Sequence, residues 1–169
     1  MISIRPASLS DVAAILELEQ YAAGAAHWDA QEYSRILKNE TAAPRFLLVA
    51  EQHSPESLHN GPTLESGNSK LRFVGFIVAR AIGPEWEIEN VAVAAQARRQ
   101  HVGTQLVRAV LDLARRDRGT SVHLEVRASN AAARALYETC GFDHIGTRKD
   151  YYRDPDEDAV LYSVGVSLD

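Results

Sequence analysis

The chain has 169 residues, 46% of them hydrophobic and 24% charged, and this composition predicts one soluble globular domain over residues 1–169. Its net charge of −5 argues against the basic face that is typical of nucleic-acid-binding proteins. No apolar run approaches the ~20 residues of a membrane span, so neither nucleic acid nor a membrane is expected as a partner.

The amino-terminal part of the chain predicts one strand followed by two helices. Ile2–Arg5 is a short apolar-polar strand. Ser8 and Asp11 have the spacing of a capping box, which predicts the start of a helix. Asp29 and Glu32 repeat this spacing and predict the start of a second helix. The first elements are therefore expected in the order β-α-α.

Three apolar strands rich in β-branched residues are predicted next, at Phe46–Glu51, Phe73–Ile82 and Trp86–Val93. The first two are separated by residues 52–72, which are rich in Ser, Gly, Pro and Asn. This segment is too long for a tight hairpin, and a mobile loop is expected there.

A short basic loop leads from the third of these strands into a long predicted helix, Val102–Arg116. The first amides of a helix have no partner within it, and the helix dipole adds about half a positive charge at that end. Together with Arg98 and Arg99 in the loop, this predicts an anion site. The alternative is a pair of solvated arginines. Arginines in the last turn and Gly119 are expected to end the helix.

The segment Leu124–Phe142, LEVRASNAAARALYETCGF, predicts a strand, a polar turn, a helix and a glycine stop. Asn130 is suited to cap the helix Ala131–Thr139 by accepting a bond from its first amides. Gly141 fits the left-handed position that ends a helix, and Phe142 can fold back onto the last turn.

Glu125, late on this strand, and Tyr137, on this helix, are expected at neighbouring edges of one strand–helix corner. A carboxylate can accept a proton and a phenol can donate one. The alternative is a surface glutamate beside a packed tyrosine. Two more strands follow, near His144–Arg148 and at Ala159–Val166. The whole order, β-α-α-β-β-β-α-β-α-β-β, predicts an α/β fold with parallel and antiparallel strand pairs.

One cysteine and six scattered histidines complete the inventory of reactive side chains. Cys140 has no partner for a disulfide within the chain, and the first residues, MISIRPASLSD, lack the pattern of a secretory signal, so a cytoplasmic protein is expected. No histidine has a recognisable spacing to Cys140, which is predicted to be a packing residue. No metal site is predicted.

The anion loop and helix, followed by the strand, turn and tyrosine helix, resemble the GCN5-related N-acetyltransferase (GNAT) family. Its loop motif, R/Q-x-x-G-x-G/A, binds the pyrophosphate of acetyl-coenzyme A (acetyl-CoA). Within the family, residues 124–142, the residues RKDYY at 148–152 and EDA at 157–159 are similar to bacterial ribosomal-protein-alanine N-acetyltransferases of the RimI type. The resemblance is specific over residues 86–160, and the first 85 residues match loosely. It implies a mixed, mainly antiparallel central sheet with flanking helices.

The resemblance also implies roles for single residues. Glu125 would accept a proton from the acceptor amine, and Tyr137 would donate one to the leaving thiolate. Coenzyme binding would involve the strand residues Val91, Ala92 and Val93, the loop and helix residues Arg98, Arg99, Gln100, His101, Val102, Gly103 and Thr104, and Asn130. His101 stands where the motif has its first glycine. Weaker or differently tuned coenzyme binding is therefore expected. Binding is not expected to be lost, because histidine tolerates unusual backbone angles better than bulkier residues do and could add a cationic contact.

The implied reaction is a direct transfer to an amine, which needs no enzyme nucleophile. An α-amine is easier to deprotonate than lysine, because its reference pKa is about 8 and that of lysine is about 10.4. The favoured acceptor is the N-terminal alanine of a ribosomal protein. Another peptide or small-molecule amine, or a non-catalytic acyl-CoA-binding module, are the alternatives.

Two assignments stay open. Glu87 and Glu89 compete with Glu125 as the proton acceptor, because many acetyltransferases use a carboxylate on that strand. Trp28 could shape the acceptor groove together with the tyrosines at 151–152, or it could pack against Tyr33 as the hydrophobic staple of the second helix. The oligomeric state is not predicted.

Overall fold

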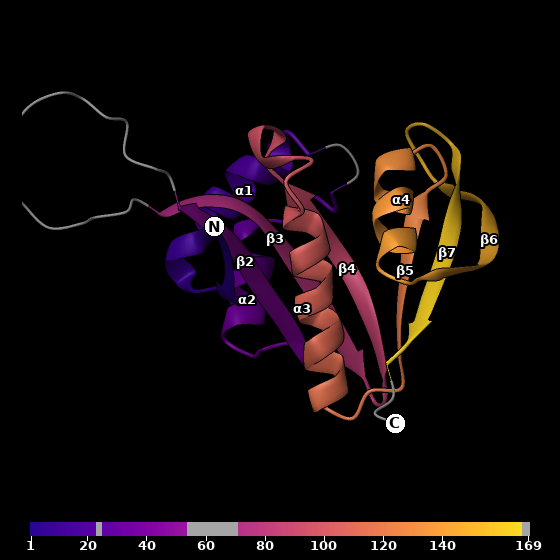
Figure 1. The fold of residues 1–169 in the computed structure, drawn as a ribbon, viewed down its shortest axis with the longest axis horizontal. Helices are drawn as coiled ribbons and strands as arrows, with labels where there is room; N and C mark the ends of the chain where they lie inside the picture. Colours follow the sequence, from indigo (N-terminus) through magenta and orange to yellow (C-terminus); the bar gives the residue numbers. More distant parts are fainter. Residues whose placement is uncertain (23–24, 54–70, 167–169) are drawn as a thin grey trace, which may run out of the picture.

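A seven-stranded sheet in the order β1-β2-β3-β4-β5-β7-β6 organises the computed structural model, with helices on both faces (Figure 1). The structure describes residues 1–22, 25–53 and 71–166. The elements are β1 (Ile2–Pro6), α1 (Val12–Gln20), α2 (Ala30–Leu37), β2 (Arg45–His53), β3 (Leu71–Ile82), β4 (Glu85–Val93), α3 (Val102–Arg116), β5 (Ser121–Arg127), α4 (Ala131–Thr139), β6 (Asp143–Tyr152) and β7 (Glu157–Gly165), with short 3-10 turns at Leu9–Asp11 and Ala95–Ala97.

The pairing of β4 with β5 is parallel, and the other neighbouring strands in this sheet pair antiparallel. The parallel ladder joins only Glu85–Ile88 to Ser121–Leu124. Beyond it the two strands diverge, as Figure 1 shows. The prediction of a mixed, mainly antiparallel sheet with flanking helices is therefore confirmed. The parallel pair is the place where the sheet opens.

A β-bulge in β4 lies beside this opening. Val78 of β3 is opposite Asn90, but the next residue, Ala79, is opposite Ile88, so that Glu89 is an extra residue in β4. An extra residue reverses the alternation of side chains along a strand. Before the bulge Ile88 faces α3 and α4, and after it Asn90 faces α1 and α2.

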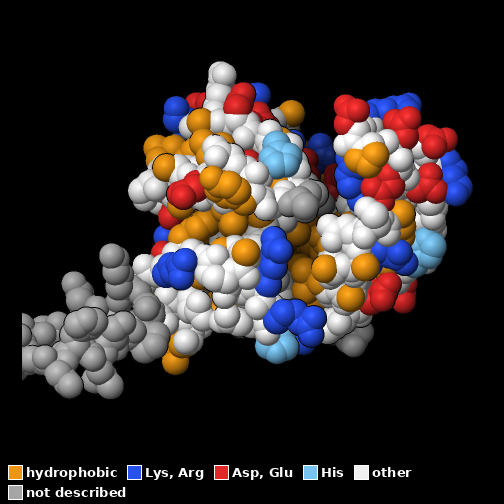
Figure 2. Space-filling view, turned by 90° about the horizontal axis from the view of Figure 1, so that it is seen from above, with side chains coloured by type: hydrophobic (Ala, Val, Ile, Leu, Met, Phe, Trp, Pro, Cys, Tyr) orange, Lys and Arg blue, Asp and Glu red, His pale blue; other side chains and the backbone are white. Residues whose placement is uncertain are grey.

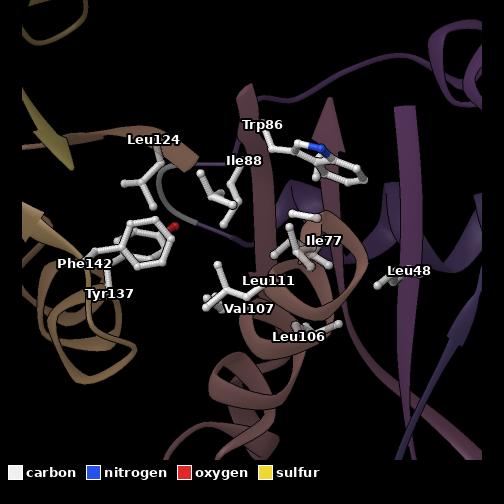
Figure 3. Close-up of a cluster of buried hydrophobic side chains, with 14 of the residues drawn as sticks. Leu48, Ile77, Trp86, Ile88, Leu106, Val107, Leu111, Leu124, Tyr137 and Phe142 are labelled. Atoms are coloured by element: carbon white, nitrogen blue, oxygen red, sulfur yellow. The ribbon is translucent and has the colours of Figure 1, made fainter. Parts of the chain in front are cut away.

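Two hydrophobic layers cover the two faces of the sheet. One lies between α1, α2 and the strands β2 to β4, and includes Ile15, Tyr33 and Phe76. The larger one lies beneath α3 and α4 and continues across β5 and β7 (Figure 3). Burial of this apolar surface is the main favourable contribution to the free energy of folding. The strand β4 contributes side chains to both layers, whereas β5 contributes to the larger one.

The predicted helix caps are present. Asp29 Oδ1 accepts the Glu32 amide at 2.8 Å, and Asn130 Oδ1 accepts the Ala133 amide at 3.1 Å. Gly141, with φ of 89°, ends α4 in the left-handed region. The Asp11 carboxylate accepts the Ser8 amide at 2.7 Å and opens the turn Leu9–Asp11 before α1 begins.

The end of α3 differs from the prediction. Arg118, with φ of 58°, takes the left-handed position, and Gly119 does not. A Cβ atom at Gly119 would lie 2.9 Å from the Ala114 carbonyl oxygen and 3.1 Å from Cδ1 of Trp86. Gly119 is therefore required because the chain passes close to Trp86, and the left-handed turn that ends the helix is supplied by an arginine.

The bounds predicted for the loop, residues 52–72, are wrong at both ends. Residues 52–53 belong to β2 and residues 71–72 to β3, and residues 54–70 lie outside the described residues. Strand β6 is longer than the predicted His144–Arg148. Within the described ranges, no helix is long and apolar enough to cross a membrane.

Candidate active site

The opening between β4 and β5 forms a cavity to which both strands and α4 contribute side chains. From above, Figure 2 shows the surface hollowed between the part built on β1 to β4 and the part that carries α4. The residues that line the cavity are Ile88, Glu89, Asn90, Val91, Glu125, Val126, Arg127, Asn130, Ala133, Tyr137 and Tyr152. Glu125, Tyr137, Val91 and Asn130, four of the residues predicted for the site, are thus brought together.

Tyr137 contributes its hydroxyl group to this cavity from α4. The residue is only 4% exposed, and its ring packs against Phe142 with 5.8 Å between ring centroids. Figure 3 shows its hydroxyl pointing from α4 toward Ile88 of β4. Burial raises the pKa of Tyr137 above its ordinary value of 10.0. At neutral pH this phenol is therefore protonated and able to donate.

Glu125 reaches the cavity from the opposite face of the sheet. Its neighbours Leu124 and Val126 are buried in the layer that contains Tyr137, so the carboxylate between them points the other way. The sequence predicted the two groups at one corner. The structure places them on opposite faces, where both reach the cavity because the strands separate directly after Leu124.

The Glu125 carboxylate is held by two groups of β6. Arg148 Nη1 lies 2.9 Å from Glu125 Oε1, and the Glu125 side chain is 21% exposed. A hydrogen bond to Glu125 raises the pKa of Tyr151, so this phenol is held in its donating form. Arg148 also lies over the Tyr151 ring. The carboxylate is thus oriented but open to solvent.

The two competing carboxylates on β4 form ion pairs with arginines. Arg80 Nη2 lies 2.5 Å from Glu87 Oε2. Glu89 accepts from Arg45 Nε at 2.7 Å and lies 3.3 Å from Arg80 Nε. Glu89 lines the cavity, but it is the centre of an ion-pair network. Its oxygens are therefore less available to an incoming amine than those of Glu125.

One backbone edge of β4 is free to bind an extended molecule. Because the ladder to β5 stops at Ile88, the stretch 89–93 has no strand partner on that side among the residues that the structure describes. This stretch contains Val91, Ala92 and Val93. Its free N–H and C=O groups can hydrogen-bond to an extended chain, as a sheet edge does to an added strand. The geometry fits the pantetheine arm of coenzyme A.

The loop before α3 presents its backbone amides at the end of this edge. Arg99 and His101 both have left-handed backbone angles, with φ of 63° and 61°. The first backbone bond of α3 runs from the Gln105 amide to the His101 carbonyl, so the amides of residues 102–104, Val102, Gly103 and Thr104, have no partner within the helix. With Arg98 exposed beside them, these amides fit a pyrophosphate group. His101 therefore stands at a position whose left-handed backbone angle favours glycine, and the histidine adopts this angle.

Gln100 in the loop and Gly103 at the start of α3 have structural roles. The Gln100 side chain accepts from Gln52 Nε2 at 2.8 Å and donates to the Gln96 carbonyl at 2.9 Å, which braces the loop against β2. A Cβ atom at Gly103 would lie 3.0 Å from Leu136 Cδ2. Glycine therefore allows the start of α3 to approach α4 closely.

The sequence did not reveal the role of two cavity residues, Asn90 and Arg127, whereas Tyr152, proposed from the sequence for the acceptor groove, does line the cavity. Simple alternation along β4 places Asn90 on the same face as Trp86, and only the bulge turns it toward α1 and α2. Arg127 lies over the Tyr152 ring, 4.4 Å from its centroid. A polar residue at an apolar position of the strand pattern was the one available signal for Asn90.

Trp28 packs as the predicted staple. Its ring centroid lies 5.8 Å from that of Tyr33, and the Arg45 guanidinium lies over it. It lines a separate hollow beside α2, whereas Tyr152 lines the cavity. Cys140 is half-buried, and burial raises the pKa of its thiol. Among the residues that the structure describes, no three His, Cys, Asp or Glu side chains are grouped to hold a metal ion.

Comparisons with known proteins show the family of this chain. A model of the acetyltransferase (GNAT) family matches residues 16–142. The chain is 34% identical over 99 residues to the ribosomal protein bS18-alanine N-acetyltransferase of Escherichia coli (strain K12), which covers 57% of this chain and 67% of that protein. It is 36% identical over 117 residues to the N-alpha-acetyltransferase RimI of Mycobacterium tuberculosis (strain H37Rv), which covers 69% of this chain and 71% of that protein.

A solved structure extends the similarity to the whole fold. The crystal structure of the ribosomal-protein-S18-alanine N-acetyltransferase from Escherichia coli matches with a TM-score of 0.75 and 26% sequence identity, over 100% of this chain and 96% of that one. The family match spans more than half of the chain and includes β4, the loop before α3, β5 and α4. The chain therefore belongs to the acetyltransferase (GNAT) family, whose fold uses acetyl-CoA, and it is an N-acetyltransferase.

Proposed function

We propose that this enzyme acetylates the α-amine of an N-terminal alanine on a ribosomal protein. The observation that carries the reaction is the position of Glu125 and Tyr137, which line one cavity from opposite faces of the sheet where β4 and β5 separate. The choice of acceptor is supported by the similarity to relatives whose name is ribosomal protein S18-alanine N-acetyltransferase.

The substrates would meet at this opening from two sides. Acetyl-CoA supplies the acetyl group as a thioester. Its pantetheine arm would lie along the free edge of β4 at residues 91–93, and its pyrophosphate would lie against the loop residues 98–101 and the first amides of α3. The sulfur would lie on the side of Tyr137. The acceptor amine would enter from the other face, where Glu125 lies.

The proton transfers follow from these positions. Glu125 accepts a proton from the acceptor α-ammonium, directly or through a water molecule, and the neutral nitrogen then bonds to the thioester carbon. The carbon–sulfur bond breaks, Tyr137 donates its proton to the leaving sulfur, and the nitrogen, now part of the amide, loses its second proton, which returns through water to the Tyr137 oxygen. Free amides of β4 near Val91 would hold the oxygen on which negative charge develops. Arg148 Nη1, 2.9 Å from Glu125 Oε1, restrains the position of this carboxylate.

A thiol-release assay with a set of acceptors tests this proposal. The acceptors are a basic peptide that begins with alanine, the same peptide with its amino end acetylated and an internal lysine, and a small polyamine. We expect release of CoA thiol with the free alanine peptide and at least about tenfold lower kcat/KM with the others, since lysine amines are more strongly protonated at neutral pH.

Two results would contradict the proposal. Faster release with the polyamine or the blocked lysine peptide would assign a different acceptor to the same reaction. Tight acetyl-CoA binding without release for every acceptor would indicate a module that binds acyl-CoA without catalysis.

A further inference from the structure

The Asn90 side chain joins three elements on the face from which the acceptor would enter. It is 5% exposed and follows the bulge in β4. Its Oδ1 accepts the Ala26 amide at 3.2 Å. Its Nδ2 donates to Glu19 Oε1 at 2.6 Å and to the Tyr33 hydroxyl at 3.1 Å. The partners belong to α1, the link between α1 and α2, and α2.

The orientation of the Asn90 amide is fixed by its surroundings. A backbone amide can only donate, so the oxygen of Asn90 must face Ala26 and the nitrogen must face Glu19. Glu19 is 2% exposed, and its second oxygen has no hydrogen-bond partner among the described residues. Burial, together with a hydrogen bond to Glu19, raises the pKa of Tyr33. A carboxylate buried in this way is costly unless its partners are kept in place.

These bonds connect the cavity to the segment in front of α2. Asn90 lies on the stretch of β4 that lines the cavity, between Glu89 and Val91. The link residues Ala25 and Ala26 contribute to the same corner, where Ala25 packs against the α1 and α2 layer. The link is thus tied to the edge of the opening by one side chain.

We propose that Asn90 is a positioning residue for the acceptor. It holds the link residues Ala25 and Ala26 against β4 and so fixes one wall of the acceptor entrance on the face of Glu125. The inference rests on the proposed function, since it assumes that an amine enters from this face. Loss of Asn90 should weaken acceptor binding and leave coenzyme binding unchanged, because its side-chain hydrogen bonds go to Ala26, Glu19 and Tyr33 on the acceptor face.

The test uses three variants of the full chain. Asn90→Ala removes all three bonds. Asn90→Asp places a second carboxylate beside Glu19 and repels it. The double variant Glu19→Gln with Asn90→Asp reverses the polarity of the pair: the new amide at 19 donates to the new carboxylate at 90, which also accepts from Ala26. Tyr33→Phe is the control, since it removes the hydroxyl that bonds to Asn90 and Glu19 and keeps the bond between Asn90 and Ala26.

Steady-state kinetics with the alanine peptide, acetyl-CoA affinity and hydrogen exchange of the Ala26 amide are measured for each variant. We expect Asn90→Ala and Asn90→Asp to raise the peptide KM about tenfold and to speed exchange at Ala26, with acetyl-CoA Kd within about twofold of the original. The double variant should restore both the KM and the exchange rate. Tyr33→Phe should leave the peptide KM unchanged and lower only the unfolding midpoint.

The outcomes separate this inference from the proposed function. If the original enzyme acetylates the peptide and Asn90→Ala does so with the same KM, the positioning role is wrong and the proposed function stands. Equal losses in acetyl-CoA affinity and peptide KM, or a double variant that fails to recover while it folds, also contradict it. If the original enzyme acetylates no acceptor, the proposed function fails, and unchanged exchange at Ala26 in Asn90→Ala would separately overturn the link to Asn90.

Discussion

At the scale of single residues, the chemistry depends on a phenol that is kept protonated. The Tyr137 ring is almost fully buried, and this burial raises the pKa of its hydroxyl above 10.0. A proton donor is useful only while it holds its proton. The alkaline limb of kcat should therefore lie above pH 10 if Tyr137 is the group that titrates.

Replacing Tyr137 by Phe should remove the donor and keep the packing. The ring contacts with Phe142 and Tyr162 do not involve the hydroxyl, so the fold should be retained. We expect kcat to fall about 10²-fold with little change in the KM for acetyl-CoA, as measured by thiol release. A Tyr137→Phe variant with unaltered kcat would show that another group protonates the sulfur.

His101 tests the departure from the family motif. Its φ of 61° is left-handed, which costs a residue with a side chain about 1–2 kcal/mol. Glycine at this position would relieve that cost, but it would also make the unfolded chain more flexible, which offsets part of the stabilisation. His101→Gly should therefore raise the free energy of unfolding by up to about 1 kcal/mol in urea titrations. Acetyl-CoA affinity should not fall. A large fall would mean that the imidazole contacts the coenzyme.

At the scale of elements, the helix that carries Tyr137 depends on its cap. Asn130→Ala removes the acceptor of the Ala133 amide and should lower the free energy of unfolding by about 1 kcal/mol. Asn130→Asp keeps an acceptor at the same position and should retain most of the stability. Chemical denaturation of both variants measures the difference. If Asn130→Ala and Asn130→Asp lower the free energy of unfolding equally, Asn130 does not stabilise the protein as a helix cap.

The elements could be predicted where their signals are local. The helices over Val102–Arg116 and Ala131–Thr139 have the predicted bounds, because caps, glycine stops and the 3.6-residue period act within a few residues. The prediction for the end of α3 was wrong in detail. Gly119 is required because the chain passes close to Trp86, which lies more than 30 residues earlier in the sequence. A close approach of distant segments leaves no local pattern.

The site could be predicted only in its composition. Glu125 and Tyr137 were placed together by their sequence spacing, and the structure does bring both to one cavity. Their approach from opposite faces depends on where β4 and β5 separate. The orientation of Asn90 toward α1 and α2 depends on the bulge at Glu89. Both features arise from pairing between distant strands, which the amino-acid pattern does not specify.

At the scale of the whole molecule, the two halves of the sheet are joined by the short parallel ladder, and the larger half is tied together at its edge. Arg5 on β1 bonds to Asp11 at 2.8 Å and to Glu51 on β2 at 2.6 Å. The hydrogen bond from Arg5 lowers the pKa of Asp11 from 3.8 to about 2. The sheet edge is therefore strengthened by an ionised carboxylate.

This ion pair predicts how stability depends on pH. A folded-state pKa below the unfolded value gives stability that is present above the unfolded pKa and is lost as the pH falls through 3.8 toward 2. Asp11→Asn should lower the free energy of unfolding by about 2 kcal/mol at pH 7. The difference from the original protein should disappear near pH 2. Urea titrations at several pH values measure it, and an equal difference at all pH values would contradict an ionic origin.

The central claim is that acetyl transfer occurs at the opening between β4 and β5 with Glu125 as the proton acceptor. The most direct test compares kcat/KM for the alanine peptide in Glu125→Gln and Glu89→Gln. Glu125→Gln should reduce kcat/KM by about 10² to 10⁴-fold and Glu89→Gln by a much smaller factor, with acetyl-CoA affinity preserved in both. If Glu89→Gln abolishes turnover and Glu125→Gln retains it, the proton acceptor has been assigned to the wrong strand.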